Sequence, residues 1–281
     1  MTGIALLTAI NTYPNSPLRG CVNDAKNMGS LLRDQYDMDL DVVRTCLDFR
    51  ATTHGMLDRI KEWVVNAPLG AWSMWHHSGH GSTYPRLLEA DGRGECICPV
   101  DYDGSPDRMI TDETLCDILR LKHPDSKLLI VLDTCFSGGM DRSEQLVSPR
   151  EHDGVTLADV LLPCERDSEV SAADRRYRYI RPPDRGTGKI TSSIVSQLPP
   201  NVIVLAGAGE DQTGADAFID HRYQGAFSFF LVSALRLGLV DSLQALIDVV
   251  AWNLSRNGFS QVPGLKGDLA LFGAAFMSEI G

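Results

Sequence analysis

Two glycine-flanked polar motifs contain the residue types that cysteine-based chemistry needs. Ser78-Gly-His80-Gly follows one expected strand, and Thr134-Cys135-Phe-Ser-Gly-Gly follows another. A thiolate attacks a carbonyl carbon far better than a thiol does, so a reactive cysteine needs a neighbouring histidine or a cationic field. The glycines let a substrate approach the backbone, whose N–H groups can stabilise an oxyanion. His80 and Cys135 together therefore predict nucleophilic catalysis.

Each of these residues taken alone has a more ordinary interpretation. A single cysteine after a buried strand is most often a small core residue, and a single histidine in a glycine-rich turn is most often a surface polar group. The two motifs, however, lie at the carboxyl ends of two expected parallel strands. Reactive side chains gather at this edge in open α/β sheets. The joint placement of His80 and Cys135 favours an active site.

The elements that must position these motifs alternate between short apolar runs and helical patterns, which is typical of a parallel sheet. Strands are expected at 3–10, 41–46, 71–76, 127–133, 202–206 and 269–272, and helices from Asn23-Asp24, from Thr52-Thr53, from Thr111-Asp112, over 226–237 and over 242–255. The run 127–133 is the most apolar and is expected at the sheet centre. We expect a single α/β domain over residues 1–281, with a mostly parallel six-stranded sheet and helices on both faces.

Composition limits the possible partners and location. The chain has 281 residues, 43% hydrophobic and 22% charged, and a formal net charge of −11 that argues against nucleic-acid binding. No apolar run is long enough to span a bilayer, and the N-terminus lacks the basic region of a signal peptide. We expect a cytoplasmic protein without a membrane partner. The seven cysteines are odd in number and lack a disulfide framework spacing, so all are expected to be free.

Several motifs resemble one peptidase family. Residues 78–81 resemble the histidine motif of caspases and metacaspases, and residues 133–138 resemble their cysteine motif. The interval from His80 to Cys135 (135 − 80 = 55 residues) suits a family whose histidine lies roughly 50 residues upstream. Segments 18–24, 98–101, 110–113, 205–217, 225–228 and 261–265 resemble metacaspases specifically. Over nearly its whole length the chain thus resembles a caspase-like cysteine peptidase of the metacaspase type, orthocaspase-like and consisting of the peptidase domain.

The resemblance implies a caspase-like fold and a role for each motif residue. Cys135 is the expected nucleophile, His80 the general base and acid, and the N–H groups of Gly81 and Cys135 the oxyanion hole, with no obvious third residue to orient the histidine. The expected S1 pocket, which holds the residue before the scissile bond, consists of Asp24, Asp133, Ser78 and Cys21. The family cleaves after Lys or Arg, and a buried carboxylate pair needs such a cation. A helix N-cap remains the alternative for Asp24.

The resemblance also implies calcium. Asp101, Asp112 and Glu113 match the family's acidic sites, and hard carboxylate oxygens suit Ca²⁺. Asp141 is the nearest fourth ligand but lies one position out of register, and an exposed acidic loop with a helix cap at Asp112 is the alternative. No zinc is expected, because the histidines at 76, 77 and 80 and the cysteines at 96 and 98 should not converge. No haem is expected, and no nucleotide either, since Gly138-Gly139 lacks the Lys-Ser/Thr that follows in a phosphate-binding loop.

Three parts follow from the resemblance: a larger-subunit-like part over about 1–139, an irregular linker over 140–189 and a smaller-subunit-like part over 190–281. The linker carries Arg142, Arg150, Arg166, Arg175, Arg176, Arg178, Arg181, Arg185 and Lys189. We expect self-processing after one of these residues, and the sequence does not single one out. A monomer that acts on protein or peptide substrates with a basic residue before the cut is expected.

Two alternatives to a calcium-stimulated, Arg/Lys-specific endopeptidase remain open. One is a catalytically silent caspase-fold interaction module, since Phe136 replaces the histidine that commonly follows the metacaspase nucleophile. The other is a thiol hydrolase or transferase of different specificity on a related α/β fold, against which the acidic residues Asp24 and Asp133 count. Neither the physiological substrate nor the pathway follows from the sequence.

Overall fold

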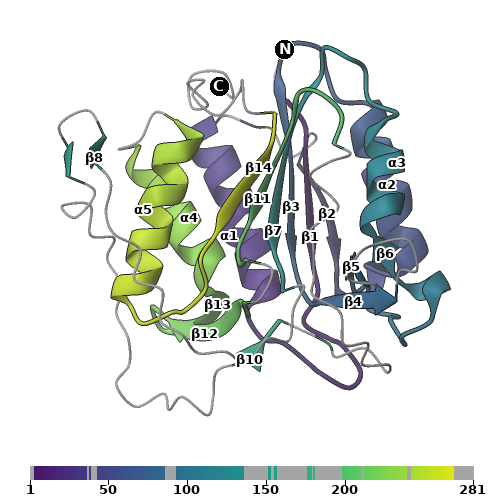
Figure 1. Cartoon of the computed structure of the whole chain (residues 1–281), viewed down its shortest axis with the longest axis horizontal. Coiled ribbons are helices and arrows are strands. Elements are labelled where there is room, and N and C mark those ends of the chain that lie inside the picture. The colour runs from purple at the N-terminus through teal and green to yellow at the C-terminus, as the bar shows by residue number, and fades with distance from the viewer. Residues whose placement is uncertain are drawn as a thin grey trace.

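A mostly parallel six-stranded sheet forms the centre of the protein (Figure 1). The computed structural model describes residues 3–36, 38, 43–85, 93–135, 151–152, 155–156, 176–178, 180, 198–209, 212–238 and 242–268. The strand order is β14-β11-β7-β3-β1-β2. The parallel strands are β1 (Ala5–Ala9), β2 (Val43–Leu47), β3 (Trp72–Ser78), β7 (Lys127–Asp133) and β11 (Val202–Ala206), and β14 (Gly264–Gly267) is antiparallel to β11. The predicted α/β class is confirmed.

Helices cover both faces of this sheet. The helices α1 (Cys21–Tyr36), α4 (Ala226–Leu237) and α5 (Leu243–Arg256) lie on one face, and α2 (Thr53–Val65) and α3 (Asp112–Leu119) lie on the other (Figure 1). The side-chain oxygens of Thr52, Thr111 and Ser242 cap α2, α3 and α5 by accepting a backbone N–H from the first turn. These caps agree with the starts that the sequence predicts for the three helices.

The strand β7 lies inside the sheet, between β3 and β11, as its apolar sequence predicts. Its residues from Leu128 to Asp133 are all buried, because helices cover both faces of a parallel sheet. Ser78 at the end of β3 is the register partner of Asp133 at the end of β7. The two motifs that follow these strands therefore start side by side.

Smaller sheets that the sequence did not predict flank the central one. One consists of β4 (Gly81–Pro85), β5 (Arg93–Ile97) and β6 (Ile110–Thr111), and another of β10 (Arg176–Tyr177), β12 (Ala215–Ile219) and β13 (Arg222–Gly225). The strands β8 (Glu151–His152) and β9 (Val155–Thr156) pair with each other, and two short 3-10 helices lie at Asp48–Arg50 and Pro106–Arg108. The strand expected at 269–272 lies outside the described residues.

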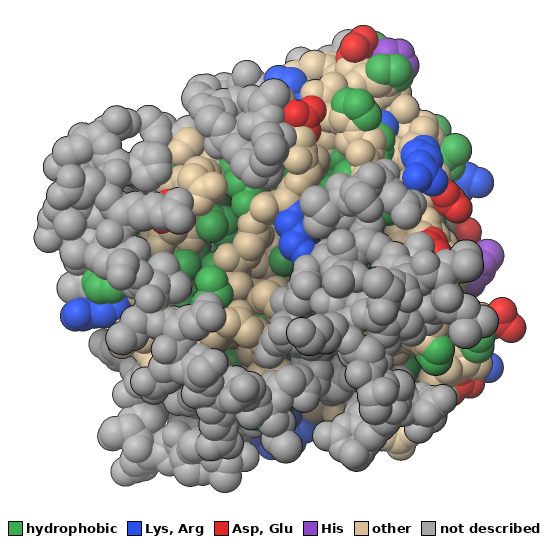
Figure 2. Space-filling model, in the orientation of Figure 1, with side chains coloured by type: hydrophobic (Ala, Val, Ile, Leu, Met, Phe, Trp, Pro, Cys, Tyr) green, Lys and Arg blue, Asp and Glu red, His purple; other side chains and the backbone are tan. Residues whose placement is uncertain are grey.

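The cysteines of the described residues are buried, and charged side chains lie on the surface. Cys21, Cys46, Cys96, Cys98 and Cys135 are free and buried, Cys116 is buried, and Cys164 lies outside the described residues. Within the described part of the chain, no helix has the length and apolarity to cross a membrane. On the described part of the face in Figure 2, basic and acidic side chains lie near one another along the right-hand edge. Asp117 of α3 and the following Arg120 form an exposed ion pair, with Oδ1 and Nη1 2.6 Å apart.

Candidate active site

The site lies where β3 and β7 end. His80 and Cys135 are both fully buried there, and the N–H of Gly79 donates to the carbonyl of Asp133 at 3.3 Å, which ties the two strand ends together. His80 lies two positions after the end of β3 at Ser78, and Cys135 lies two positions after the end of β7 at Asp133. The sheet register thus places the motifs of His80 and Cys135 at neighbouring strand ends.

Backbone and ring contacts fix the orientation of His80. Its N–H donates to the hydroxyl of Tyr13 at 2.9 Å, its carbonyl accepts from the N–H of Cys98 at 3.0 Å, and its ring centroid lies 4.5 Å from that of Tyr13. The ring Nε2 lies 2.7 Å from the carbonyl oxygen of Ser16. A carbonyl can only accept, so Nε2 carries the proton and Nδ1 keeps the lone pair. The Ser16 carbonyl is therefore the orienting group that the sequence did not reveal.

The second nitrogen of His80 is available for chemistry. Nδ1 is buried and has no hydrogen-bond partner among the described residues. Burial lowers the pKa of His80 to about 4, although the backbone carbonyls of Ser16 and Arg178 act in the opposite direction. The ring is therefore neutral at physiological pH and can accept a proton at Nδ1.

The Cys135 thiol is held in its protonated form in this state. Its Sγ accepts a hydrogen bond from the N–H of Gly214 and is fully buried. Burial raises the pKa of Cys135 to about 12, and the charge of Asp133 adds to this, while the Gly214 N–H and Arg178 lower the value. The thiol is thus uncharged while the site is closed, and it becomes a nucleophile only when a base accepts its proton.

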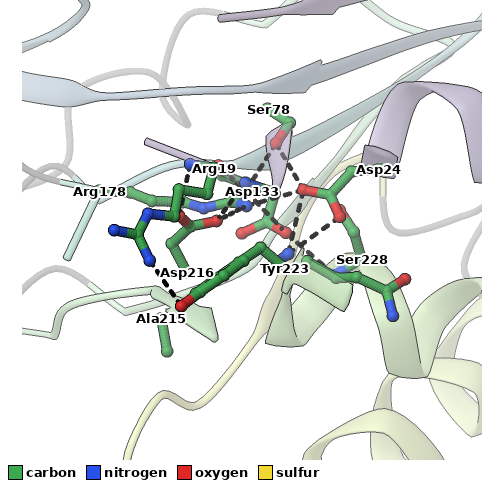
Figure 3. A network of polar contacts seen from close by, with 12 residues as sticks. Arg19, Asp24, Ser78, Asp133, Arg178, Ala215, Asp216, Tyr223 and Ser228 are labelled. Atoms are coloured by element: carbon green, nitrogen blue, oxygen red, sulfur yellow. Dashed lines mark hydrogen bonds and ion pairs between the residues drawn. The ribbon is translucent and has the colours of Figure 1, made fainter. Parts of the chain in front are cut away.

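A side chain of the same chain fills the acidic pocket beside the thiol. The guanidinium of Arg178 is fully buried and lies 2.7 Å from Asp24 Oδ2, 3.1 Å from Asp133 Oδ2 and 3.3 Å from Asp216 Oδ1 (Figure 3). It also donates to Ser78 Oγ at 2.6 Å, and that hydroxyl donates to Asp24 Oδ2 at 2.8 Å. The predicted pocket residues Asp24, Asp133 and Ser78 thus converge on one guanidinium.

Backbone N–H groups hold the three carboxylates in place. Gly225, the N-cap of α4, donates to Asp24 at 2.9 Å, and Ser228 in the first turn of that helix donates to Asp133 at 3.0 Å. Two further N–H groups, those of Arg19 at 2.8 Å and Gly20 at 2.9 Å, donate to the carboxylate of Asp216. The N-terminal end of a helix stabilises negative charge, so α4 supports this anionic pocket. Asp24 itself lies in the first turn of α1 and faces the pocket, which makes the N-cap interpretation wrong.

The charge balance of the pocket demands a cation. Burial raises the pKa of Asp24 to about 7, and the carboxylate of Asp133 adds to the rise, against the lowering by Arg178. Burial lowers the pKa of Arg178, but the negative charges of Asp133, Asp24 and Asp216 outweigh burial and raise it. Cys21, the fourth predicted pocket residue, is buried beside this charge, and burial raises its thiol pKa. An uncharged occupant would leave the carboxylates uncompensated.

The carbonyl of Arg178 meets the two N–H groups that the resemblance assigned to an oxyanion hole. Its oxygen accepts from the N–H of Gly81 at 3.0 Å and from the N–H of Cys135 at 3.3 Å. Two N–H donors on a single carbonyl oxygen polarise that carbonyl and stabilise the oxyanion that an attack on it would create.

The acidic residues expected to bind calcium are only partly brought together. Asp112 Oδ1 and Glu113 Oε2 both accept from the hydroxyl of Tyr84, at 2.7 and 3.2 Å. Asp101 instead accepts from the N–H and hydroxyl of Thr53 at the start of α2, at 2.8 and 3.1 Å. Asp141 lies outside the described residues, and within the described ranges no three acids, histidines or cysteines form a metal-binding group. The described residues alone therefore supply two adjacent carboxylates and no complete calcium site.

The histidines next to the motif serve structural hydrogen bonds. His76 Nε2 lies 3.1 Å from Ser228 Oγ, and His77 Nδ1 lies 2.8 Å from Thr8 Oγ1. Adjacent residues of a strand point to opposite faces, which explains why these two rings contact different elements. Burial lowers the pKa of both rings to about 3, so both are neutral.

Sequence reasoning missed several groups at the site. Asp216 belongs to a segment that resembles the family, but only the pairing of β12 reveals that its carboxylate reaches the pocket. Ser16 and Gly214 contribute backbone atoms, which leave no signal in side-chain types. Arg178 was one of nine basic linker residues with nothing to distinguish it.

Comparisons with known proteins show which peptidases the chain is similar to. The chain matches the family model "Metacaspase, peptidase C14 domain" over residues 4–142. It is 27% identical to Metacaspase-1A of Aspergillus niger, over 93% of this chain and 69% of that protein, and 28% identical to Metacaspase-1A of Aspergillus fumigatus, over 93% and 68%. Its fold is similar to that of protein GSU0716 from Geobacter sulfurreducens, with a TM-score of 0.66, 20% identity and 98% of both chains covered. The chain belongs to the metacaspase family, peptidase C14, and is a cysteine-type peptidase.

Proposed function

We propose that this peptidase cleaves polypeptides after Arg or Lys, with Cys135 as nucleophile and His80 as general base and acid. The observation that carries the proposal is the position of Arg178, whose guanidinium meets three buried carboxylates while its carbonyl accepts from Gly81 and Cys135. A peptide bound in the same way would place a basic side chain in the pocket and its carbonyl beside the nucleophile. The pocket would thus recognise the charge of the side chain and at the same time position the carbonyl of the same residue for attack.

The proposed reaction follows from the protonation states of the dyad. His80 Nδ1 accepts the proton of Cys135, and the resulting thiolate attacks the carbonyl carbon of the residue in the pocket. The N–H groups of Gly81 and Cys135 stabilise the oxyanion. His80 then donates its proton to the leaving amine, and water hydrolyses the thioester to regenerate the thiol. The Ser16 carbonyl keeps Nε2 protonated throughout, so Nδ1 remains the nitrogen that exchanges protons.

The specificity is tested with two fluorogenic peptides that carry Arg or Asp before the reporter. Wild type and Cys135→Ala are assayed side by side. The proposal predicts turnover of the Arg peptide by wild type, and loss of this turnover in Cys135→Ala. Cleavage after Asp would refute the pocket assignment. Absence of turnover on either peptide would favour the catalytically silent interaction module.

Calcium stimulation is a separate part of the proposal. The adjacent carboxylates of Asp112 and Glu113 offer hard oxygen ligands, which support it, and further ligands would have to come from elsewhere in the chain. A chelator is expected to lower the rate on the Arg peptide, and added Ca²⁺ to restore it. An equal rate with chelator and with Ca²⁺ would contradict this part and leave the peptidase proposal intact.

Self-processing in the linker is the remaining part of the proposal. It is supported by the presence of a linker residue inside the pocket of the same chain. Fragments should appear on incubation of wild type and not of Cys135→Ala. An intact wild-type chain that still cleaves peptides would refute self-processing alone.

A further inference from the structure

The residues around Arg178 lie in the site in the manner of a bound peptide strand. The strand β10 pairs antiparallel with β12, with Arg176 opposite Asp216 and Tyr177 opposite Ala215. The N–H of Arg178 then donates to the carbonyl of Gly214 at 3.2 Å. Addition of an extended segment to a sheet edge is a general mode of peptide recognition, since main-chain hydrogen bonds hold it in one register.

Hydrogen bonds also hold the chain on the C-terminal side of Arg178, at Ile180. The N–H of Ile180 donates to the carbonyl of Gly81 at 3.0 Å, and Ser82 Oγ donates to the carbonyl of Ile180 at 2.6 Å. Tyr179 lies outside the described residues. Contacts on both sides of the peptide bond after Arg178 therefore fix the carbonyl of Arg178 between them.

The register distinguishes Arg178 from the neighbouring basic residue. The guanidinium of Arg176 donates to the carbonyl of Pro17 at the protein surface, whereas that of Arg178 is fully buried among the carboxylates. Only Arg178, of these two, also has its carbonyl at the N–H groups of Gly81 and Cys135. Arg178 therefore meets both requirements of the proposed cleavage, since its cation lies among the carboxylates and its carbonyl lies at the expected oxyanion hole.

We propose that the peptide bond between Arg178 and Tyr179 is the self-cleavage site of this chain, and that residues 176–178, with Arg178 in the S1 pocket, block this pocket until the bond is cut. This inference rests on the proposed function and specifies its regulation. Because the segment and the nucleophile belong to one chain in the structure, the cut is intramolecular. A substrate peptide can enter only after Arg178 leaves the pocket.

The step balances with water as the one co-reactant. Sγ of Cys135 forms a bond to the carbonyl carbon of Arg178, and the bond from that carbon to the nitrogen of Tyr179 breaks. The proton taken from the thiol passes through His80 to this nitrogen, which becomes a new amino terminus. Water then cleaves the thioester, leaving Arg178 with a free carboxylate and Cys135 with its thiol.

The test maps the fragment boundary by mass spectrometry of the purified full chain incubated with and without calcium. Wild type is expected to give fragments that end at Arg178 and begin at Tyr179, and Cys135→Ala is expected to give none. Arg178→Gln should remove this cut, and Arg178→Lys should retain it because the cation is kept. Arg176→Gln is the matched control and should be cut at the same bond. The rate constant should not change over a 100-fold dilution of the protein, since an intramolecular reaction is first order.

An Arg reporter peptide assayed in the same samples separates the possible failures. Turnover of the reporter with a wild-type fragment boundary elsewhere would overturn the inference and leave the proposed function standing. Turnover at full rate by an uncut wild-type chain would overturn the blocking of the pocket. Absence of both turnover and fragments under all conditions would overturn the proposed function and the inference with it. The position of the cut in the wild-type chain tests the inference even if Arg178→Gln does not fold.

Discussion

Asp133 uses only one of its two carboxylate oxygens for the contacts that define the pocket. Oδ2 accepts from the N–H of Ser228 at 3.0 Å and lies 3.1 Å from the guanidinium of Arg178. Oδ1 is buried and has no hydrogen-bond partner within the described ranges. An asparagine with its amide nitrogen at the Oδ1 position would keep both contacts of the remaining oxygen. Asp133→Asn therefore removes the charge with little change of shape.

Asp133→Asn should lower kcat/KM for the Arg peptide by about 30-fold or more, because a desolvated charge pair is broken on one side, at a cost of about 2–5 kcal/mol. The charge of Asp133 raises the pKa of Cys135, so its removal does not weaken the acidity of the thiol. Steady-state kinetics of wild type and Asp133→Asn measure the effect. Asp117→Asn, an exposed residue of α3, is the control and should leave the kinetics unchanged. Equal kcat/KM for Asp133→Asn and wild type would contradict the role of this charge.

Residue types revealed part of the site from sequence alone. Cys135, His80 and the carboxylates of Asp24 and Asp133 stand out because their motifs resemble a family and their side chains carry the chemistry. The carbonyl of Ser16 and the N–H of Gly214 act through the backbone, which every residue possesses. Such contributions become visible only when the loops that carry them are placed in space.

At the scale of elements, the start of α4 closes the pocket. Gly225 is the N-cap of α4 and follows β13 directly. A Cβ at this position would lie 2.2 Å from Asp133 Oδ2 and 2.6 Å from the guanidinium nitrogen Nη2 of Arg178. Since Cβ atoms do not approach other atoms so closely, even one methyl group would displace the carboxylate or exclude the guanidinium.

Gly225→Ala should therefore lower kcat/KM for the Arg peptide at least about tenfold, which corresponds to about 1.4 kcal/mol. The loss should appear in KM, because the pocket is narrowed while His80 and Cys135 are untouched. Gly264→Ala in β14 is the matched control, since a Cβ there meets no atom within 4 Å. If both alanine variants bound the Arg peptide as wild type does, the close packing of α4 against the pocket would be refuted.

The elements differ in how far sequence predicts them. The strands β7 and β11 and the helix α4 have the bounds expected from their apolar patterns. A strand that is buried on both faces appears in the sequence as a continuous apolar run, and a helix that is buried along one face appears as apolar residues at helical spacing. The hairpin of β12 and β13 was missed, since its short strands mix polar and apolar residues. This hairpin carries Asp216 and the edge that binds β10, so the missed element is one that completes the pocket.

At the scale of the whole molecule, three buried histidines link stability to pH. Burial lowers the pKa of His76 and His77 to about 3 and that of His80 to about 4. Between about pH 4 and 6.5 the unfolded chain binds protons at these rings and the folded chain does not, so acid favours unfolding. Burial raises the pKa of Asp24 to about 7, and this single group acts in the opposite direction between about pH 4 and 7.

The three histidines should outweigh Asp24, so the free energy of unfolding should fall as the pH is lowered from 6.5 towards 5. Each group contributes about 1 kcal/mol per pH unit, so three histidines against one aspartate leave a net loss of about 2 kcal/mol per unit. Urea unfolding of the Cys135→Ala chain at pH 6.5 and 5.5 measures it, with self-cleavage removed. An equal or higher free energy of unfolding at pH 5.5 would show that the rings are not held neutral in the folded state.

A pocket beside Cys135 that selects a positive charge must distinguish arginine from an uncharged residue of the same shape. This selection is measured by comparing kcat/KM of wild type for two peptides that differ only in Arg or citrulline before the scissile bond. Citrulline has nearly the same shape as arginine but is uncharged, so it cannot compensate the carboxylates of Asp24, Asp133 and Asp216. Wild type should prefer the Arg peptide by about 30-fold or more in kcat/KM. Equal kcat/KM for the two peptides would contradict it.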